Sequence, residues 1–313
     1  MIVNHVMSNM VYSKIFIDIL KNFIKFSRHT IVVSERPISN ADIYHYHRVN
    51  LENREALCFP SICTVHHDLY DIDKSLDINF FIEKYKKMNA VVCLNKNQQT
   101  ILKEFKCQNI RVIPHGYDPD IFLPKPKVTK DKINILLISR RYGRGVKGEA
   151  YIRELLKYLN NSSISFTLVG EDRSKDYKYF SMFGFECNVH EKLPYKTFGS
   201  LYNYHDFLLV VSSFEGGPAN VPEAIATGTP IIATPVGMIP DVVENLNNGI
   251  ILTGDVYTDA QRLNSFFQND KLLRTIQDNC LKNNNLKKAI TWKKNIELYD
   301  DLYEELNNER VHS

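Results

Sequence analysis

Short apolar runs of strand length alternate with longer segments whose apolar positions recur every three or four residues, along most of the 313-residue chain. This alternation is typical of βαβ units, and most runs are continuously apolar, as expected for parallel strands covered on both faces. In the first part of the chain, helical patterns at 11–26, 79–88 and 96–106 separate several runs expected as strands: "MIVNHV", "HTIVVS", "ADIYHYH", "SICTVHH", "NAVVCLN" and "IRVIPHG". The pattern predicts an α/β fold with a doubly wound parallel sheet.

A second series of the same kind follows "LPKPKVTKDK", a stretch rich in proline and lysine that is interpreted as a linker between domains. The strands expected after it are "KINILLISR", "SISFTLVGE", "HDFLLVVSS", "PIIATPVG" and "GIILTG". We therefore expect two Rossmann-like domains facing across a cleft, at 1–124 and 133–285, with a linker at 125–132. A C-terminal helix at 286–313 is expected to pack back on the first domain.

Composition and charge exclude several classes of protein. A net charge of +3 is too mild for a nucleic-acid groove, and no stretch combines dense Lys and Arg with spaced aromatic residues. The six cysteines are scattered without a C-x-x-C pair, which favours reduced thiols and a cytoplasmic protein. No segment is typical of a signal peptide or a membrane span.

The segment "KIFIDILKNFIKF" has two interpretations. Its apolar residues gather on one side of a helix, with lysines elsewhere, which favours a helix packed on the sheet. A basic amphipathic helix also suits an anionic membrane surface, so peripheral membrane contact, at the inner face of the membrane, stays open.

The stretch "VVSSFEGGPANVPEAIATGTPIIATPVG" places Glu215 and Glu223 on either side of a glycine loop, between two apolar runs. Asn220 as the N-cap of a helix would put Glu223 at the capping-box position, with Gly228 as the stop signal. This purely structural role is one explanation of Glu223.

Glu215 is harder to explain by structure alone. It follows a predicted central strand, where open α/β sheets bind ligands, and Gly216 and Gly217 allow a ligand close to backbone N–H groups. A helix start favours anions, whereas a carboxylate accepts hydrogen bonds from hydroxyls. A ligand with both phosphate and hydroxyl groups, such as a nucleotide sugar, satisfies both.

The same stretch resembles the donor-site signature of family 4 retaining glycosyltransferases of GT-B fold, in which two glutamates are separated by seven residues. Glu215 and Glu223 have this spacing. "VIPHGYDPDIF" is similar to the segment closing the first domain of that family, "FTLVGE" to its "VGxG" strand, and "TWKKNIELYDDLY" to its terminal helix. The resemblance implies an acceptor-side domain at 1–124 and a nucleotide-sugar-binding domain at 133–285. It also implies that Glu215 contacts donor-sugar hydroxyls, Glu223 the ribose, and Gly216, Gly217 and Pro218 the region of the hexose and diphosphate.

A basic loop follows the first strand of the second half, in "LLISRRYGRGVKGEAYIREL". Departure of a nucleoside diphosphate builds negative charge, so a site without metal needs fixed cations. The resemblance assigns this role to an arginine and to Lys147, which stands before Gly148. Arg140 is the first choice for the arginine, with Arg141 the alternative; a solvated basic loop is the structural alternative.

Histidines end two strands of the first half that are expected to be neighbours, in "IYHYH" and "TVHHD". His-x-His invites a metal hypothesis, but His66 and His67 point opposite ways on a strand and no second ligand set supports them, so no metal is expected. In the resembling family a "T-x-H" supplies a histidine near the reacting sugar. Here that implies His66, with His67 as the alternative and a merely structural role for both left open.

These features predict a metal-independent hexosyltransferase that needs no cofactor and uses a nucleoside-diphosphate sugar with a glycan or lipid-linked glycan acceptor, in polysaccharide assembly. The family commonly has glycines after its first strand, whereas "HVMSNMVYSK" has none, and the first half is short. Two alternatives therefore stay open: a catalytically inert GT-B homologue acting as a partner subunit, and a sugar-nucleotide epimerase. The sequence indicates no oligomeric state.

Overall fold

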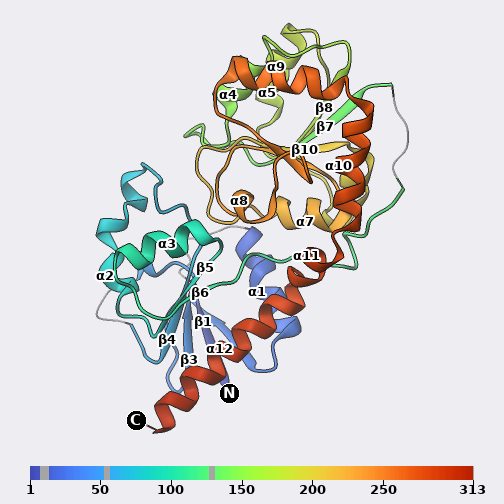
Figure 1. Cartoon of the computed structure of the whole chain (residues 1–313). Coiled ribbons are helices and arrows are strands. Elements are labelled where there is room, and N and C mark those ends of the chain that lie inside the picture. Colours follow the sequence, from blue (N-terminus) through green and yellow to red (C-terminus); the bar gives the residue numbers. More distant parts are fainter. Residues whose placement is uncertain (8–13, 53–56, 127–130, 313) are drawn as a thin grey trace. The chain divides into compact units, whose positions relative to one another are not determined.

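The computed structural model of the chain describes residues 1–7, 14–52, 57–126 and 131–312, which fold into two compact units (Figure 1). The first unit comprises Met1–Gly116, Glu215–Gly217 and Ala289–Ser313, and the second comprises Tyr117–Phe214 and Pro218–Lys288. The first residues of the helix expected at 11–26, part of "HVMSNMVYSK" and half of the expected linker lie outside the described residues.

The first unit is built on a six-stranded parallel sheet in the order β2-β1-β3-β4-β5-β6. Its strands are β1 (Ile2–Val6), β2 (Thr30–Ser34), β3 (Ile43–Tyr46), β4 (Ser61–Val65), β5 (Ala90–Cys93) and β6 (Ile110–Val112). All six runs predicted as strands in this part of the chain are confirmed. Four of the six are buried or nearly so along their length, because helices cover both faces.

Helices pack on the first sheet from both sides. On one face, α1 (Lys14–Phe26) and α12 (Trp292–His312) contribute Ile19, Phe23, Ile296 and Tyr303 to the core. On the other face lie α2 (Ile82–Tyr85) and α3 (Lys96–Glu104), where the Asn95 side chain caps α3 by accepting from the Gln98 N–H. Short 3₁₀ helices complete the unit at Val49–Leu51, Lys74–Leu76 and Ile78–Phe80.

The second unit contains a parallel sheet in the order β12-β11-β10-β7-β8-β9. Its strands are β7 (Ile133–Ile138), β8 (Ile164–Val169), β9 (Glu186–His190), β10 (Phe207–Val210), β11 (Ile231–Ala233) and β12 (Gly249–Ile251). Counted from β7, this is the strand order of a Rossmann sheet. Five of these strands were predicted and are confirmed. The edge strand β9 was missed, because its sequence "ECNVH" is half polar and no residue in it is fully buried.

Helices of the second unit bury one large apolar core, in which α4, α5, α9 and α10 face the sheet. The helices are α4 (Glu149–Leu155), α5 (Ser174–Met182), α6 (Phe198–Tyr204), α7 (Asn220–Thr227), α8 (Ile239–Val242), α9 (Val256–Phe267), α10 (Asp270–Lys282) and α11 (Asn284–Ala289), with a 3₁₀ turn at Tyr195–Thr197. Side chains of Asp255 and Asn269 cap α9 and α10. Among the described residues, no helix is both long and apolar enough to cross a membrane.

The capping box expected at the start of α7 is wrong. The helix begins at Asn220 itself, its N-cap is Ala219, and no side chain caps it. The Asn220 side chain instead donates to the Ile138 carbonyl at the end of β7, and the Glu223 carboxylate accepts from tyrosine hydroxyls. The predicted stop is confirmed, because Gly228 ends α7 with a φ of 70°.

Candidate active site

The strand order of the second unit marks one place on its sheet for ligands. β7 and β10 pair directly although some 70 residues separate them, and they form the point where the strand order reverses. Ligands of open α/β sheets bind outside the carboxyl ends of strands at such a point. The loop after β7 carries the predicted basic residues, and the connection after β10 carries the predicted glutamate and glycines.

The two candidate arginines of the basic loop are held differently. Nε of Arg141 lies 3.1 Å from Asp176 Oδ1, and Asp176 is buried. Nε of Arg140 lies 3.1 Å from Glu171 Oε2, and both side chains of this pair are 59% exposed. Arg141 is therefore part of the support of the loop, whereas Arg140 is presented to solvent.

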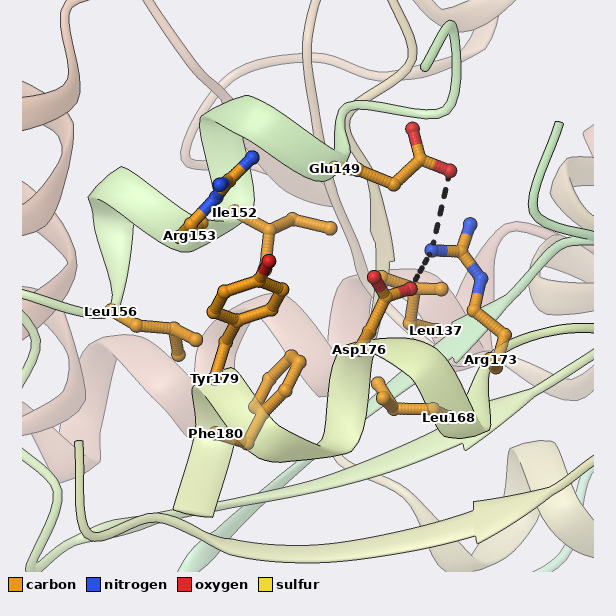
Figure 2. A pocket seen from close by; sticks show the side chains of 10 residues that line it. All are labelled: Leu137, Glu149, Ile152, Arg153, Leu156, Leu168, Arg173, Asp176, Tyr179 and Phe180. Carbon is orange, nitrogen blue, oxygen red and sulfur yellow. Dashed lines mark hydrogen bonds and ion pairs between the residues drawn. The ribbon is translucent and has the colours of Figure 1, made fainter. Parts of the chain in front are cut away.

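A buried arginine, Arg173, holds the start of this loop in place. Figure 2 shows Arg173 between Glu149 and Asp176, at one end of a small pocket lined otherwise mainly by apolar side chains. Nη1 of Arg173 lies 2.8 Å from Asp176 and 3.5 Å from Glu149, and its Nε and Nη2 donate to Ser139. None of the predicted site residues lines this pocket. Its role is structural, because Arg173 and Asp176 together hold the residues that follow β7.

Lys147 lies at the other end of the basic loop, directly before α4. Its Nζ lies 5.5 Å from the centre of the Tyr142 ring, and the Arg140 guanidinium carbon lies 5.6 Å from the same ring. Gly148 has a φ of 79°, and a Cβ there would lie 2.0 Å from the Val211 carbonyl oxygen. Only glycine fits this close approach of the loop to the end of β10, which explains the Lys-Gly pair.

The predicted residues Glu215, Gly216 and Gly217 belong to the first unit by their contacts. The Glu215 N–H donates to Asp68 Oδ2 over 3.1 Å, and Asn95 Nδ2 donates to the Gly216 carbonyl over 2.7 Å. A Cβ on Gly216 would lie 2.4 Å from the His66 carbonyl oxygen, so a side chain at this position would collide with the end of β4. The glycine is required for backbone contact. Asp68 was named from the sequence only as part of the "TVHHD" cluster, and Asn95 was not singled out.

Glu223 lies on the first turn of α7 and is only 5% exposed. Tyr195 donates to its Oε1 and Tyr202 to its Oε2, both over 2.7 Å. Burial raises the pKa of the carboxyl from its ordinary 4.5 to about 7, although the two hydroxyls oppose the rise. Each oxygen keeps a second lone pair, so Glu223 can accept a further hydrogen bond.

Pro218 and Asn220 complete this part of the second unit. Pro218 is buried and its carbonyl accepts from the Val221 N–H. Within the part of the chain that the structure describes, Asn220 Oδ1 is buried without a hydrogen-bond partner. An orphaned buried acceptor beside the end of β7 marks Asn220 as a candidate ligand contact that sequence reasoning assigned to a cap.

The neighbouring histidines of the first unit point to opposite faces of the sheet, as predicted. The His67 ring packs edge-on against Phe81, with ring centres 5.1 Å apart. The His66 ring faces the other side, where Nε2 lies 3.1 Å from His47 Nδ1 and Nδ1 lies 3.4 Å from His115 Nε2. Both ring nitrogens of His66 therefore contact other histidines. His115, in "IPHG", and His5 were not singled out from the sequence.

Comparison with known proteins places this fold and these residues in context. The sequence profile of the family described as "Glycosyl transferases group 1" matches residues 121–283. An uncharacterized glycosyltransferase of Methanocaldococcus jannaschii is 24% identical over 269 residues, covering 82% of this chain and 71% of the relative.

Solved structures of GT-B glycosyltransferases have the same fold. HepE of Anabaena, in complex with UDP and glucose, matches with a TM-score of 0.73 and 14% identity, covering 98% of this chain and 100% of that chain. WaaG, a glycosyltransferase involved in lipopolysaccharide biosynthesis, matches with a TM-score of 0.73 and 13% identity, covering 97% and 99%. Sucrose-phosphate synthase from Thermosynechococcus elongatus matches with a TM-score of 0.71 and 17% identity, covering 85% and 74%.

Proposed function

The chain belongs to the glycosyl transferases group 1 family, and we propose that this glycosyltransferase moves a hexose-type sugar from a nucleoside diphosphate to an acceptor hydroxyl with retention. One observation carries the proposal. The loop with Arg140 and Lys147 and the connection that begins toward Glu215 leave the sheet from the adjacent strands β7 and β10, at the switch point of a Rossmann-type sheet.

Cleavage of the bond between sugar and diphosphate is the step in which charge develops. The bond from the anomeric carbon to the diphosphate oxygen breaks, and the departing oxygen takes the electron pair. We assign stabilisation of this charge to Arg140 and Lys147, which flank Tyr142. The acceptor hydroxyl then bonds to the oxocarbenium-like carbon on the same face, and its proton passes to the departing diphosphate. In this scheme the fixed cations need no metal or cofactor.

The acidic residues take the hydroxyl groups of the donor. We assign Glu215 to the sugar, with Gly216, Gly217 and Pro218 near the diphosphate, and Glu223 to the ribose. The free acceptor Asn220 Oδ1 supports a hydroxyl-bearing or N–H-bearing ligand at the start of α7. Because Tyr195 and Tyr202 already donate to Glu223, a ribose hydroxyl would add a third hydrogen bond to a carboxylate that is held in place.

Similar proteins indicate which donors and acceptors to test first. HepE has been solved with UDP-glucose and with UDP and glucose, and TarM with UDP and a glycosylated glycerol. WaaG is involved in lipopolysaccharide biosynthesis. We propose a uridine diphosphate sugar as donor and a glycan or lipid-linked glycan as acceptor, in cytoplasmic polysaccharide assembly.

A donor screen tests the proposal directly. The purified chain is mixed with a panel of nucleotide sugars, and donor binding and slow release of nucleoside diphosphate are measured. We expect one or a few donors to bind and to be hydrolysed slowly, and Lys147→Met to lower turnover about 100-fold or more. Lys157→Met is the matched control, because Lys157 is an exposed lysine of the same unit that pairs with Glu154. Folded protein that binds no donor would contradict the proposal.

The products separate the proposed activity from its alternatives. A glycosyltransferase releases nucleoside diphosphate, an epimerase returns an isomerised nucleotide sugar, and an inert partner subunit does neither. Glu215→Ala in the native pathway should abolish the product if the chain is catalytic. Full activity of that variant would support a partner subunit instead.

We also propose that α1 makes peripheral contact with an anionic membrane. Ile17 and Ile24 are 43% and 60% exposed, and they share a face of the helix with the exposed residues Lys21 and Lys25. Sedimentation with vesicles containing anionic lipid should show binding that Ile17→Ser with Ile24→Ser weakens. Leu298→Ser is the control, because Leu298 is an exposed apolar residue of α12 whose exposure of 40% is close to that of Ile17. Equal sedimentation with neutral vesicles would contradict this assignment.

A further inference from the structure

A continuous series of hydrogen-bonded side chains lies between the first sheet and the helices α1 and α12. Nδ1 of His5 lies 2.9 Å from Nε2 of His47, whose Nδ1 lies 3.1 Å from Nε2 of His66, whose Nδ1 lies 3.4 Å from Nε2 of His115. We call these four residues the imidazole chain. His5, His47 and His115 are buried and His66 is partly buried, and burial lowers the pKa of each, to about 3 for His47 and about 4 for His115. The rings are therefore neutral at physiological pH.

The periodicity of the strands brings these side chains together. His5 pairs with His45 across β1 and β3, so both project from the same face of the sheet. His45 and His47 are two positions apart on and just after β3, and Thr64 and His66 are two apart on and just after β4. Neighbouring parallel strands thus place their polar residues in one layer.

His45 and Tyr303 close the inner end of the imidazole chain. The Tyr303 hydroxyl lies 2.7 Å from His45 Nδ1 and 3.4 Å from His5 Nε2. Nε2 of His45 lies 2.8 Å from the Thr64 hydroxyl, which lies 3.1 Å from the Tyr299 hydroxyl. The outer end is His115 Nδ1, which is buried and has no partner of normal hydrogen-bond distance and angle among the described residues. The backbone of Gly217 is near enough to this ring to oppose, in part, the lowering of its pKa by burial.

The geometry of the rings disfavours a metal ion here, although one nitrogen each of His5, His45 and His47 lies within 4.8 Å of the others. Lone pairs of imidazole nitrogens lie in the ring plane, so ligands of one ion need planes that converge on it. The rings of His45 and His47 are stacked, with centres 4.2 Å apart and planes 23° apart. Their nitrogens are also occupied by hydrogen bonds.

A neutral imidazole carries one N–H donor and one acceptor, so each ring in such a series dictates the tautomer of the next. Only two proton orders satisfy every link. In one order all five rings carry the proton on Nε2, and in the other all five carry it on Nδ1. The Tyr303 hydroxyl lies between His45 and His5 and has a single proton to donate. Donation to His45 goes with the order that has all protons on Nε2, and donation to His5 goes with the order that has all protons on Nδ1.

We infer that Tyr303 and Thr64 select the order with all protons on Nε2, and that this order fixes the tautomer of His66. Tyr303 Oη lies 2.7 Å from His45 Nδ1 but 3.4 Å from His5 Nε2, and hydrogen bonds from O–H donors are on average shorter than those from N–H donors, so the shorter contact is assigned to donation by Tyr303. His45 then donates from Nε2 to Thr64, and Tyr303 accepts from His5. The order propagates through His47 to His66 and leaves Nδ1 of His115 as an open acceptor.

The consequence for the proposed function, on which this step rests, concerns the polarity of the first unit. In this order His66 Nδ1 accepts from His115 Nε2–H, and His115 Nδ1 is the acceptor that stays open, which suits a hydroxyl group and not a carbonyl or phosphate oxygen. His5, His45, His47, Thr64 and Tyr303 then act as positioning residues that fix the tautomer of His66 and, through it, that of His115, without contact to substrate.

Nitrogen NMR of the whole protein tests this coupled order of protons along the rings, called the relay below, without any assay of activity. Two-bond proton–nitrogen spectra of the ¹⁵N-histidine-labelled chain at pH 7.5 distinguish the two tautomers of each ring. We expect His5, His45, His47, His66 and His115 all to carry the proton on Nε2. Thr64→Val removes the acceptor for His45 Nε2–H and should convert the five rings to the Nδ1–H order, because a buried unpaired N–H is costly.

A second variant and a control separate the relay from simple packing. Tyr303→Phe removes the hydroxyl that sets the order and should leave His47 and His66 as mixed tautomers. Tyr46→Phe removes another buried hydroxyl, which accepts from the Cys58 N–H on the opposite face of β3, and should leave all five spectra unchanged. Different tautomers at His47 and His66 in the unmodified protein, or an unchanged His66 in folded Thr64→Val, would overturn the inference.

Two further measurements complete the test. One equivalent of Co²⁺ should give no visible band; a tetrahedral Co²⁺ spectrum that His5→Asn removes would identify a metal site instead and overturn the relay. With an identified donor, Thr64→Val should lower kcat/KM about tenfold, the size of one lost hydrogen bond. If no donor is found the proposed function fails, whereas the NMR result still decides the relay.

Discussion

Glu223 is the clearest example in the second unit of a titratable side chain that is buried. Its carboxyl accepts from two tyrosine hydroxyls, yet burial still raises its pKa to about 7. The folded state therefore holds a proton that the unfolded chain releases near pH 4.5. Such a group favours the folded state at low pH, and this contribution is lost as the pH rises from about 4.5 through about 7.

Replacing Glu223 by Gln should remove that pH dependence. A pKa rise from 4.5 to about 7 corresponds to about 3 kcal/mol at most, so the variant should gain up to this amount over the original protein between pH 5 and pH 8. Urea unfolding of both proteins at several pH values measures the difference. A difference in unfolding free energy that stays constant over this range would contradict the assigned burial.

Replacement of each of the two arginines after β7 should have a different effect on stability and on activity. Arg141→Gln loses the pair with the buried Asp176 and should destabilise the second unit by about 1 kcal/mol, because Arg173 still holds that carboxylate. Arg140→Gln breaks only an exposed pair with Glu171 and should cost less than about 0.5 kcal/mol, while it lowers kcat/KM for the donor strongly. Equal losses of activity without a difference in stability would argue against this division of roles.

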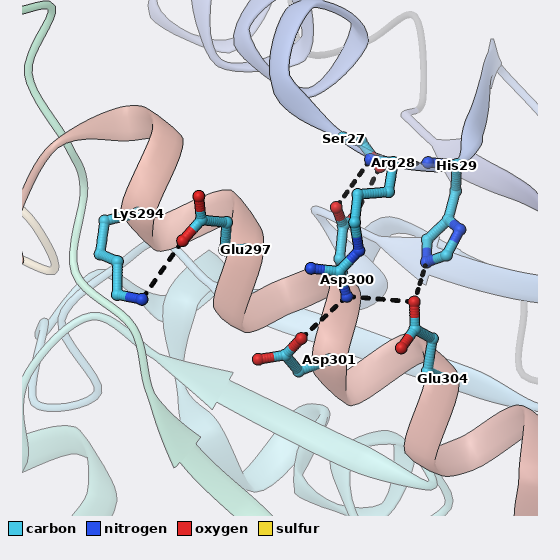
Figure 3. A network of polar contacts seen from close by, with 8 residues as sticks. All are labelled: Ser27, Arg28, His29, Lys294, Glu297, Asp300, Asp301 and Glu304. Carbon is cyan, nitrogen blue, oxygen red and sulfur yellow. Dashed lines mark hydrogen bonds and ion pairs between the residues drawn. The ribbon is translucent and has the colours of Figure 1, made fainter.

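At the scale of elements, α12 is fixed to the first unit through the connection between α1 and β2. Figure 3 shows Asp300 beneath Ser27 and Arg28, with Asp301 and Glu304 beside the Arg28 side chain. Asp300 is fully buried and accepts from the Ser27 hydroxyl over 2.6 Å and from the Arg28 N–H over 2.8 Å. Arg28 contacts Asp301 and Glu304 only through exposed ion pairs.

Asp300→Asn should therefore destabilise the first unit far more than Asp301→Asn. The buried change weakens two hydrogen bonds to a charged acceptor, which amounts to about 1–3 kcal/mol. The exposed change should cost less than about 0.5 kcal/mol. Thermal unfolding followed by the fluorescence of Trp292, the chain's one tryptophan, compares the two variants. Equal effects would show that Asp300 does not anchor the helix.

Some helices and strands could be predicted from the sequence and others could not, depending on whether local residues or distant contacts determine them. Central strands such as β4 are buried on both faces and appear as continuous apolar runs, whereas the edge strand β9 needs no such run and was missed. The start of α7 was wrongly explained, because Asn220 binds the end of β7 rather than its own helix. His5 and His115 gain their surroundings from long-range pairing, which no local pattern contains.

The molecule combines two parallel-sheet units in which burial shifts pKa values in opposite directions. It raises the pKa of Glu223 in the second unit and lowers the pKa of the imidazoles in the first. Lowering the pH therefore adds to the stability contribution of the one group and removes that of the others. Trp292 lies in the first unit with its ring centre 5.8 Å from that of His115, so its fluorescence reports on the unit that holds the imidazoles.

Acid should unfold the first unit at a pH where most domains are stable. The pKa values of its imidazoles are lowered, mainly by burial, so the unfolded chain takes up protons below about pH 6.5 while the folded unit takes them up only at a distinctly lower pH, about 4 for His115 and about 3 for His47. Stability is thus complete above pH 6.5 and falls as the pH drops, by as much as about 1.4 kcal/mol per pH unit for each ring. Trp292 fluorescence in urea should show a steep loss between pH 6.5 and pH 5. His45→Phe should reduce the slope by one ring's share, Glu223→Gln should leave it unchanged, and a Trp292 transition that is constant from pH 7 to pH 5 would refute the neutral, buried state of the cluster.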